Sequence, residues 1–277
     1  MNTFGQKIQN NWKELPTRLF IRNRCRRFDE EAVLGRQIRI AGENLVVRSR
    51  EEDLAGIFTV REELANSDEI IAFEDFGTGK RSVPGAWVKP EKSDYRHVSE
   101  IYRRSAIPHV WGAFLYHLSR SVKPQNVLEL GTNLGMSALY FQAALRCAEN
   151  LQSGGHLYTI EGDPTLAGMA ERRLRATGSN TTVINGTFEE SLPAVCKMAR
   201  KFDLVFIDGH HDENAAIHYV EMIRPYLSNN AIIILDDTEP WAGNIRRAFN
   251  RLRAGRDICG TLDLLKMAIL VYRGDEN

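Results

Sequence analysis

Cysteine, long apolar runs and an excess of one charge are all scarce in this chain, and each scarcity excludes a class of protein. The four cysteines are widely spaced, with no CxxC pair and no cluster of cysteine with histidine. A disulfide framework or a zinc site is therefore not expected, and a reducing compartment fits better. No run of about 18 apolar residues predicts a membrane span, and no apolar core of signal-peptide length occurs near the N-terminus. We therefore expect a cytoplasmic protein.

Charge is balanced over the whole chain but uneven along it. Basic and acidic residues both total 36, so no net charge points to nucleic acid or to a membrane surface. Residues 1–50, however, hold 11 basic against 5 acidic residues, a net charge of +6. The basic residues are densest between Arg18 and Arg27. A solvated helix face or a docking surface accounts for this segment, and an anionic partner or lipid surface is the alternative.

Three zones follow one another along the sequence. Residues 1–60 form a basic N-terminal extension with a short strand-like run at Asn44–Arg48. Residues 61–100 are loop-rich: after the helix-like run Val60–Ala65, three glycines and two prolines fall between Gly77 and Pro90. Residues 101–277 alternate between short apolar runs and helical stretches.

This alternation predicts a doubly wound α/β fold. The apolar runs, typical of a buried parallel sheet, are Asn126–Leu130, His156–Ile160, Thr182–Ile184, Asp203–Ile207 and Ala231–Leu235. The helical stretches are Leu134–Glu149, Leu166–Ala176, Glu189–Lys201, Glu213–Tyr226 and Trp241–Arg253. Two further strand candidates, Ile258–Leu264 and Lys266–Tyr272, are nearly contiguous and predict an antiparallel hairpin. We therefore expect a seven-stranded, mostly parallel sheet that ends in this hairpin.

The first turn of this domain has the features of a cofactor-binding turn. A predicted strand leads through Glu129-Leu-Gly-Thr-Asn-Leu-Gly-Met-Ser137 directly into a helix. Gly131 and Gly135 let the backbone turn tightly and approach a ligand, and the helix N-terminus offers free N–H groups. Proteins that bind NAD, FAD or S-adenosylmethionine (SAM) all use such a turn, and a purely structural turn is the remaining alternative.

Three acidic or amide side chains favour SAM over a dinucleotide. Asn133 stands where the dinucleotide pattern G-x-G-x-x-G needs its second glycine. Glu129 places a carboxylate inside the turn, where it would repel a pyrophosphate but suits the cationic sulfonium and the amino group of SAM. The second strand ends at Glu161, and an acid there can accept hydrogen bonds from both ribose hydroxyls.

The two segments that carry Glu129 and Glu161 resemble the first two motifs of class I SAM-dependent methyltransferases, and the resemblance covers roughly residues 95–275. It is closest to the catechol-O-methyltransferase-like branch, which includes bacterial small-molecule O-methyltransferases. The resemblance implies a Rossmann-like methyltransferase fold, with Pro108–Gly112 beside the methionine moiety and Gly186–Phe188 beside adenine. The implied cofactor-binding residues are Glu129, Gly131, Thr132, Asn133, Gly135, Ser137, Glu161, Gly162, Asp163, Thr187, Phe188 and Asp208.

Three carboxylates follow the last two parallel strands. Asp208 ends the fourth strand, and Asp236 and Asp237 follow the fifth. If these strands are neighbours, their ends lie about 5 Å apart, and the carboxylates repel one another unless a cation lies between them. Oxygen ligands suit Mg²⁺ or Ca²⁺, and metal-dependent relatives place their metal ligands at these three positions. A metal-free cofactor contact at Asp208 and a helix cap at Asp237 are the alternatives.

His211 is the candidate general base, with Asp208 as the second predicted catalytic residue. Catechol-type relatives carry a lysine at the position of His211, and a neutral imidazole can likewise accept a proton near pH 7. We also expect Tyr95, His97 and Trp241 to form walls of the substrate pocket. The lesser candidates for the base are His97, His109, His210 and His218.

We therefore expect a SAM-dependent methyltransferase that methylates a hydroxyl group of a small molecule with help from Mg²⁺ or another divalent ion. The alternatives are metal-independent N- or C-methylation, a non-catalytic SAM-binding or scaffold protein, and an NAD-dependent oxidoreductase. Nucleic acid is not expected as the acceptor, because no catalytic tetrapeptide of the N/D-P-P-Y type occurs. Residues 1–60 are expected to cap the site or to mediate homo-oligomer formation, 61–100 to lie on the substrate side, and 101–277 to bind SAM.

Overall fold

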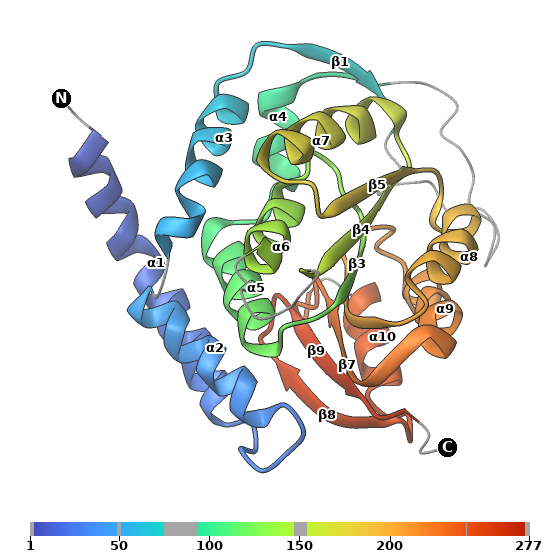
Figure 1. The fold of residues 1–277 in the computed structure, drawn as a ribbon. Coiled ribbons are helices and arrows are strands. Elements are labelled where there is room, and N and C mark those ends of the chain that lie inside the picture. The colour runs from blue at the N-terminus through green and yellow to red at the C-terminus, as the bar shows by residue number, and fades with distance from the viewer. Residues whose placement is uncertain (1–2, 49–50, 75–93, 147–153, 242, 275–277) are drawn as a thin grey trace.

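The computed structural model describes residues 3–48, 51–74, 94–146, 154–241 and 243–274, and within them the predicted α/β fold is confirmed (Figure 1). Seven strands form one sheet in the order β5-β4-β3-β6-β7-β9-β8. They are β3 (Asn126–Leu130), β4 (His156–Glu161), β5 (Thr181–Asn185), β6 (Phe202–Ile207), β7 (Leu227–Leu235), β8 (Ile258–Asp263) and β9 (Ala268–Tyr272). Strands β3 to β7 run parallel. Their order reverses between β3 and β6, which is where open α/β sheets bind ligands.

The register of the parallel strands brings the predicted site segments to one edge of the sheet. Leu130 at the end of β3 pairs with Ile160 of β4 and with Ile207 of β6. Ile207 in turn pairs with Leu235 at the end of β7. The glycine-rich turn and the three aspartates follow these residues directly, so the carboxyl ends of the strands hold them side by side.

Helices cover both faces of the sheet (Figure 1). On one face lie α5 (His109–Val122), α6 (Met136–Arg146) and α7 (Pro164–Thr177), and on the other α8 (Phe188–Ala199), α9 (Glu213–Ile223) and α10 (Asn244–Leu252). Alternate residues of each strand enter opposite cores, as Phe206 and Ile207 do. The predicted continuation of the first helix to Glu149 lies outside the described residues.

The helix predicted to begin at Glu213 ends a turn earlier than predicted. The sequence pattern extends it to Tyr226, whereas α9 ends at Ile223 and a short 3-10 turn, η2 (Arg224–Tyr226), follows. Pro225 has no N–H to continue the helical hydrogen bonds, so the helix stops before it.

The predicted C-terminal hairpin is confirmed. Strand β9 pairs antiparallel with both β7 and β8. Because Ala268 pairs with Leu235, the turn that precedes β9 lies beyond the end of β7. This register carries Lys266 to the edge of the sheet that holds the aspartates.

The N-terminal extension consists of helices α1 (Thr3–Arg26) and α2 (Gly35–Val47), and the strand predicted at Asn44–Arg48 is wrong. That run forms the last turn of α2 and its C-cap. Ile38, Ala41, Gly42 and Leu45 recur at helical spacing and are buried in the core that α5 also enters. A five-residue run is too short to reveal this period, which is why it reads as a strand.

Part of the basic segment docks onto the chain itself. Arg18 is only 1% exposed, donates to Leu45 O at 2.7 Å and forms an ion pair with Glu51 in the 3-10 turn η1 (Glu51–Leu54). Arg24 Nε donates to Asp263 O at 2.7 Å in the C-terminal hairpin. These contacts favour the docking surface among the alternatives for this segment.

Residues 51–105 add helices and a small sheet beside the main one. Helix α3 (Ala55–Ala65) precedes β1 (Ile70–Phe73), and β2 (Asp94–His97) leads into α4 (Val98–Ser105). Strands β1 and β2 pair antiparallel, an element that the sequence pattern did not reveal. The predicted loop between Gly77 and Pro90 lies outside the described residues. Among the helices that the structure does describe, none is long and apolar enough to cross a membrane.

Candidate active site

A cavity of about 520 Å³ opens beyond the carboxyl ends of β3, β4, β6 and β7, with one wall from α4 and the segment after it. Most of the predicted cofactor residues line it: Gly131, Thr132, Asn133, Ser137, Glu161, Gly162, Thr187, Phe188 and Asp208. The predicted metal and base residues Asp236, Asp237 and His211 line it too. The cavity therefore joins the two halves of the predicted site.

The turn after β3 is shaped by close backbone packing. Gly131 has φ of 105°, and a Cβ at this position would lie 2.0 Å from Asp208 O, so only glycine fits. Asn133 adopts the left-handed conformation with φ of 47°, and its Oδ1 accepts from Leu134 N at 2.7 Å. The side chain thus satisfies a backbone N–H just ahead of α6, where a second glycine would leave it free.

Glu161 is held at the floor of this half of the cavity. Its Oε2 accepts from Asn133 N at 2.7 Å and its Oε1 from Asp163 N at 3.0 Å. The side chain is 8% exposed, and burial raises its pKa to about 6 despite these hydrogen bonds. A carboxylate keeps further lone pairs when it accepts two backbone N–H groups, so a ligand diol can still bind here. The residues therefore fit the ribose of SAM.

Three predicted cofactor residues do not line the cavity. Gly135 faces Ala170 of α7, while Asp163 caps α7 by accepting from Leu166 N at 2.7 Å. Glu129 is fully buried and accepts from Thr159 Oγ1 at 2.5 Å, and burial raises its pKa to about 7. Its Oε1 has no hydrogen-bond partner among the described residues. Their predicted roles toward the cofactor stay predictions.

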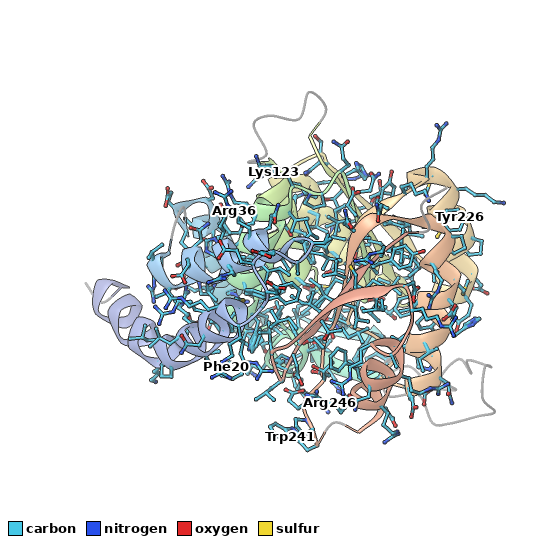
Figure 2. All side chains as sticks on the ribbon, turned by 90° about the horizontal axis from the view of Figure 1, so that it is seen from below. Phe20, Arg36, Lys123, Tyr226, Trp241 and Arg246 are labelled. Carbon is cyan, nitrogen blue, oxygen red and sulfur yellow. The ribbon has the colours of Figure 1, made fainter. Side chains whose placement is uncertain are left out.

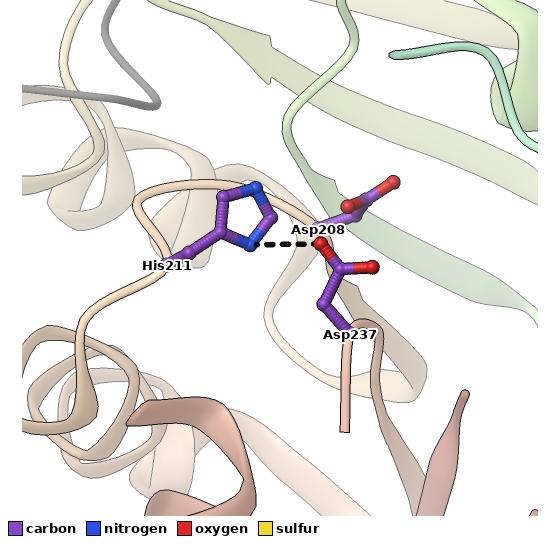
Figure 3. A group of neighbouring side chains, drawn as sticks. All are labelled: Asp208, His211 and Asp237. Atoms are coloured by element: carbon purple, nitrogen blue, oxygen red, sulfur yellow. Dashed lines mark ion pairs between the residues drawn. The ribbon is translucent and has the colours of Figure 1, made fainter. Parts of the chain in front are cut away.

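The other half of the cavity holds Asp208, His211 and Asp237 (Figure 3). One ligand atom from each lies within 4.8 Å of the others, and His211 Nδ1 is 3.4 Å from Asp237 Oδ2. His211 is 39% exposed, so its ring can reach a bound acceptor. Asp237 adopts the left-handed backbone conformation, with φ of 51°, which Asp tolerates better than most residues.

A lysine that the sequence pattern did not reveal lies among the carboxylates. Lys266 Nζ is 3.0 Å from Asp236 Oδ2 and 2.8 Å from Asp237 Oδ1. Asp236 is buried, and its Oδ1 has no hydrogen-bond partner within the described part of the chain. The magnesium site predicted at Asp208, Asp236 and Asp237 thus stays a prediction, and two of its three ligands already bind an ammonium group.

The electrostatics of this half are dominated by burial and by the lysine. Burial and repulsion by Asp237 raise the pKa of Asp208 to about 7. Burial likewise raises the pKa of Asp236, to which repulsion by Asp208 adds. Burial also disfavours the charge of Asp237, but the Lys266 ammonium outweighs it and lowers the pKa. Asp237 is therefore the carboxylate that stays ionised beside His211.

The predicted aromatic and histidine walls are wrong for the cavity as the described residues define it. Tyr95 and His97 flank Arg96 on β2, and the alternation of a strand points only Arg96 into the cavity. Trp241 is 81% exposed and points outward (Figure 2). Phe73 of β1 and the arginines Arg96, Arg103 and Arg104 line this side instead. The pairing of β1 with β2 brings Phe73 and Arg96 to this side, which no local pattern predicts.

The lesser histidine candidates have other partners. His210 lines the cavity, but its Nδ1 lies 2.7 Å from Tyr219 OH, which donates to Glu189 Oε1 at 2.7 Å. His109 contacts Tyr140 OH at 2.8 Å, and burial lowers its pKa to about 3. His218 is exposed on α9 and does not line the cavity. Within the described chain, His211 is thus the histidine placed against the carboxylates.

Comparison with known proteins identifies relatives that are methyltransferases. A family model described as a methyltransferase domain matches residues 128–238. A catechol O-methyltransferase from Niastella koreensis is 33% identical over 178 residues, which cover 59% of this chain and 76% of that protein. One from Mycobacterium tuberculosis is 29% identical over 136 residues, 48% of this chain and 57% of that protein. The chain thus spans little more than half the length of this second relative.

Solved structures show the same fold at lower identity. An O-methyltransferase from Bacillus cereus in complex with SAH is 21% identical, with a TM-score of 0.51 over 61% of this chain and 84% of that one. A cofactor-bound protein from MTB is 18% identical, with a TM-score of 0.55 over 85% of this chain and 96% of that one. The Niastella relative and the matched methyltransferase domain show the family, and the solved structures share its fold. The chain belongs to the class I SAM-dependent O-methyltransferases.

Proposed function

We propose that the protein transfers the methyl group of SAM to a hydroxyl group of a small molecule. The observation that carries this proposal is the position of His211 and Asp237 in the same cavity as the Glu161 turn. One half of the cavity offers a carboxylate for a ribose, and the other offers a base held by a second carboxylate. The cavity volume of about 520 Å³ suits a small ligand beside a cofactor.

The chain's own residues would bind SAM, orient the catalytic imidazole and deprotonate the acceptor hydroxyl. Glu161 and the Gly131 turn would hold SAM. When bound, SAM supplies a methyl group from its sulfonium sulfur, and the remainder of the molecule leaves as a neutral thioether that needs no proton. His211 would accept the proton of the acceptor hydroxyl as the new oxygen–carbon bond forms. Asp237, 3.4 Å from the ring, would orient the imidazole and stabilise its charged form. Positioning the acceptor in this cavity would contribute much of the rate enhancement.

The class of acceptor is proposed from the names of relatives and from the charge of the cavity wall. Relatives from Niastella koreensis and Mycobacterium tuberculosis are named catechol O-methyltransferases, so a vicinal diol or a phenol is the first class to test. Arg96, Arg103 and Arg104 also line the cavity and add positive charge to its wall. A small acceptor with an acidic group is therefore a natural second class.

Metal assistance, predicted from the sequence, has one observation in its favour and one against it. Asp208, His211 and Asp237 offer three ligand atoms within 4.8 Å of one another, a spacing that a divalent ion can bridge. The ion pairs of Lys266 with Asp236 and Asp237 already supply a positive charge at the same place. A metal is therefore not built into the proposed transfer.

The proposal is tested by transfer of an isotopically labelled methyl group. The purified protein is incubated with methyl-labelled SAM and a panel of catechols, phenols, sugars and acidic diols, with EDTA in one series. The expected product carries the label on oxygen, as NMR of the product shows. Label on nitrogen or carbon of the product would show N- or C-methylation in place of the proposed O-methylation. Binding of SAM without transfer to any acceptor, in folded protein, would favour a non-catalytic SAM-binding role.

A further inference from the structure

The carboxylates at the acceptor end of the cavity have a cationic partner from within the chain. Lys266 Nζ contacts Asp236 at 3.0 Å and Asp237 at 2.8 Å. The side chain of Asp236 is 5% exposed and that of Lys266 is 22% exposed, so both groups have lost most of their hydration. Charge-assisted hydrogen bonds of this kind are about twice as strong as neutral ones, and breaking one leaves a buried charge uncompensated.

Backbone hydrogen bonds fix the lysine beside these carboxylates. Lys266 lies in the turn between β8 and β9, after Leu265 with φ of 67°. Thr238 N donates to Lys266 O at 2.8 Å, and Thr238 Oγ1 donates to Leu265 O at 2.7 Å. Thr238 is fully buried and directly follows Asp237. The lysine turn and the aspartate loop are therefore tied together, unlike a surface lysine that meets an acid by chance.

A divalent ion would need the oxygen atoms that this arrangement already uses. One oxygen of Asp237 accepts from Lys266, and the other lies 3.4 Å from His211. An ion bound by Asp208, His211 and Asp237 would place a second positive charge next to the ammonium, and like charges repel strongly in a low dielectric. Mg²⁺ in addition demands near-octahedral geometry. This donor set therefore does not suit the ion. The set predicted from the sequence, Asp208, Asp236 and Asp237, suits it less, because Lys266 already contacts two of its three members.

We propose that the Lys266 ammonium takes the place of a divalent ion among these carboxylates, so that the methyl transfer needs no metal. Lys266 is a positioning residue in this scheme: it donates to Asp236 and compensates the charge of Asp237, which orients His211. An ammonium group has three N–H donors, two of which bond to the aspartates among the described residues, and Lys266 also lines the cavity. The role in transfer rests on the proposed function, but the exclusion of a metal is a property of the folded chain alone.

The test is a titration with Mn²⁺, followed by the electron paramagnetic resonance signal of the free ion. It compares the wild type with Lys266→Met, which keeps an unbranched side chain but removes the charge, and with Lys266→Arg, which keeps the charge. We expect wild type and Lys266→Arg to leave Mn²⁺ free, and Lys266→Met to bind one ion about tenfold more tightly or better. Adding Asp237→Asn to Lys266→Met should abolish that gain.

Two results would overturn the proposal. One is stoichiometric Mn²⁺ binding by the wild type that Asp208→Asn or Asp237→Asn removes. The other is a folded Lys266→Met protein, checked by circular dichroism, that binds Mn²⁺ no better than the wild type. If that variant does not fold, Lys266→Gln replaces it, and the wild-type titration still decides. None of these readouts requires SAM or an acceptor, so a failure here is distinct from a failure of the proposed methyl transfer.

Discussion

The two halves of the cavity lie on the same edge of one sheet, but they are built in different ways. The half after β3 and β4 is made of short segments in which neighbouring residues satisfy one another, as Leu134 N does with Asn133 and Asp163 N does with Glu161. The half after β6 and β7 gathers its charges from three separate loops, and its cation comes from a hairpin near the end of the described chain. Local motifs thus define the cofactor half, whereas sheet register defines the acceptor half.

The largest effect should come from breaking the cofactor half alone. Glu161→Gln keeps the shape of the side chain but removes the charge that accepts Asn133 N, Asp163 N and, by proposal, the ribose hydroxyls. We expect the affinity for S-adenosylhomocysteine (SAH) to fall about 10³-fold or more, because charge-assisted hydrogen bonds to two hydroxyls are lost together. Calorimetry measures the loss. Asp237→Asn is the matched control and should stay close to the wild type; an equal loss there would show that the halves are not separate.

The next largest effect should come from the acceptor half. His211→Gln removes the proposed base, so kcat should fall about 10²- to 10³-fold while the affinity for SAH stays unchanged. His218→Gln is the matched control, because that histidine is exposed on α9 away from the cavity. Steady-state kinetics with an accepted hydroxyl substrate gives both values. A fall in SAH affinity that matches the fall in kcat would argue for a structural rather than a chemical role.

A smaller effect, on the free energy of unfolding, is expected from Glu129, the buried acid behind the cofactor half. Burial raises the pKa of Glu129 from 4.5 to about 7, so the folded state keeps its proton to higher pH than the unfolded state does. Its contribution to stability is present below pH 4.5 and is lost as the pH rises through about 7. We expect Glu129→Gln to stabilise the fold by about 1–3 kcal/mol at pH 8 and by little at pH 4.5. Urea unfolding at both values checks this. If the variant differs from the wild type in unfolding free energy by the same amount at both pH values, the raised pKa of Glu129 is contradicted.

The smallest effect should come from a residue outside both halves. Trp241→Ala removes a large side chain that is 81% exposed and does not line the cavity. We expect stability to change by less than about 0.5 kcal/mol and kcat/KM by less than about twofold. Phe73→Ala, on the cavity wall, is the contrasting variant and should lower kcat/KM by more than this. If the two substitutions had the same effect on kcat/KM, the boundary of the cavity would have to be redrawn.

The same difference explains which features were predictable from the sequence. The five parallel strands and the hairpin are visible because each is a short apolar run bounded by turns, and the Gly131 turn is a contiguous motif. The run at Asn44–Arg48 was misread because the helical period of α2 extends beyond it. Lys266 stayed hidden because its role depends on the pairing of Ala268 with Leu235, which a local pattern does not contain.

The wall of the cavity that β1 and β2 form was the least predictable. Aromatic residues near a predicted site are plausible pocket residues, but the alternation of β2 turns Tyr95 and His97 away and Arg96 inward. Phe73 enters because β1 pairs with β2 across residues 75–93, which lie outside the described chain. Such long-range pairing is set by tertiary packing rather than by local propensity.

The most direct test of this account is calorimetric titration of SAH into the wild-type protein. We predict a single site with a dissociation constant of about 1–100 µM, about 5–8 kcal/mol of binding free energy. EDTA should leave that affinity unchanged, because the cofactor half contains no metal ligand in this account. An absence of binding, in protein that circular dichroism shows to be folded, would contradict the assignment of the Glu161 half to SAM and with it the proposed methyl transfer.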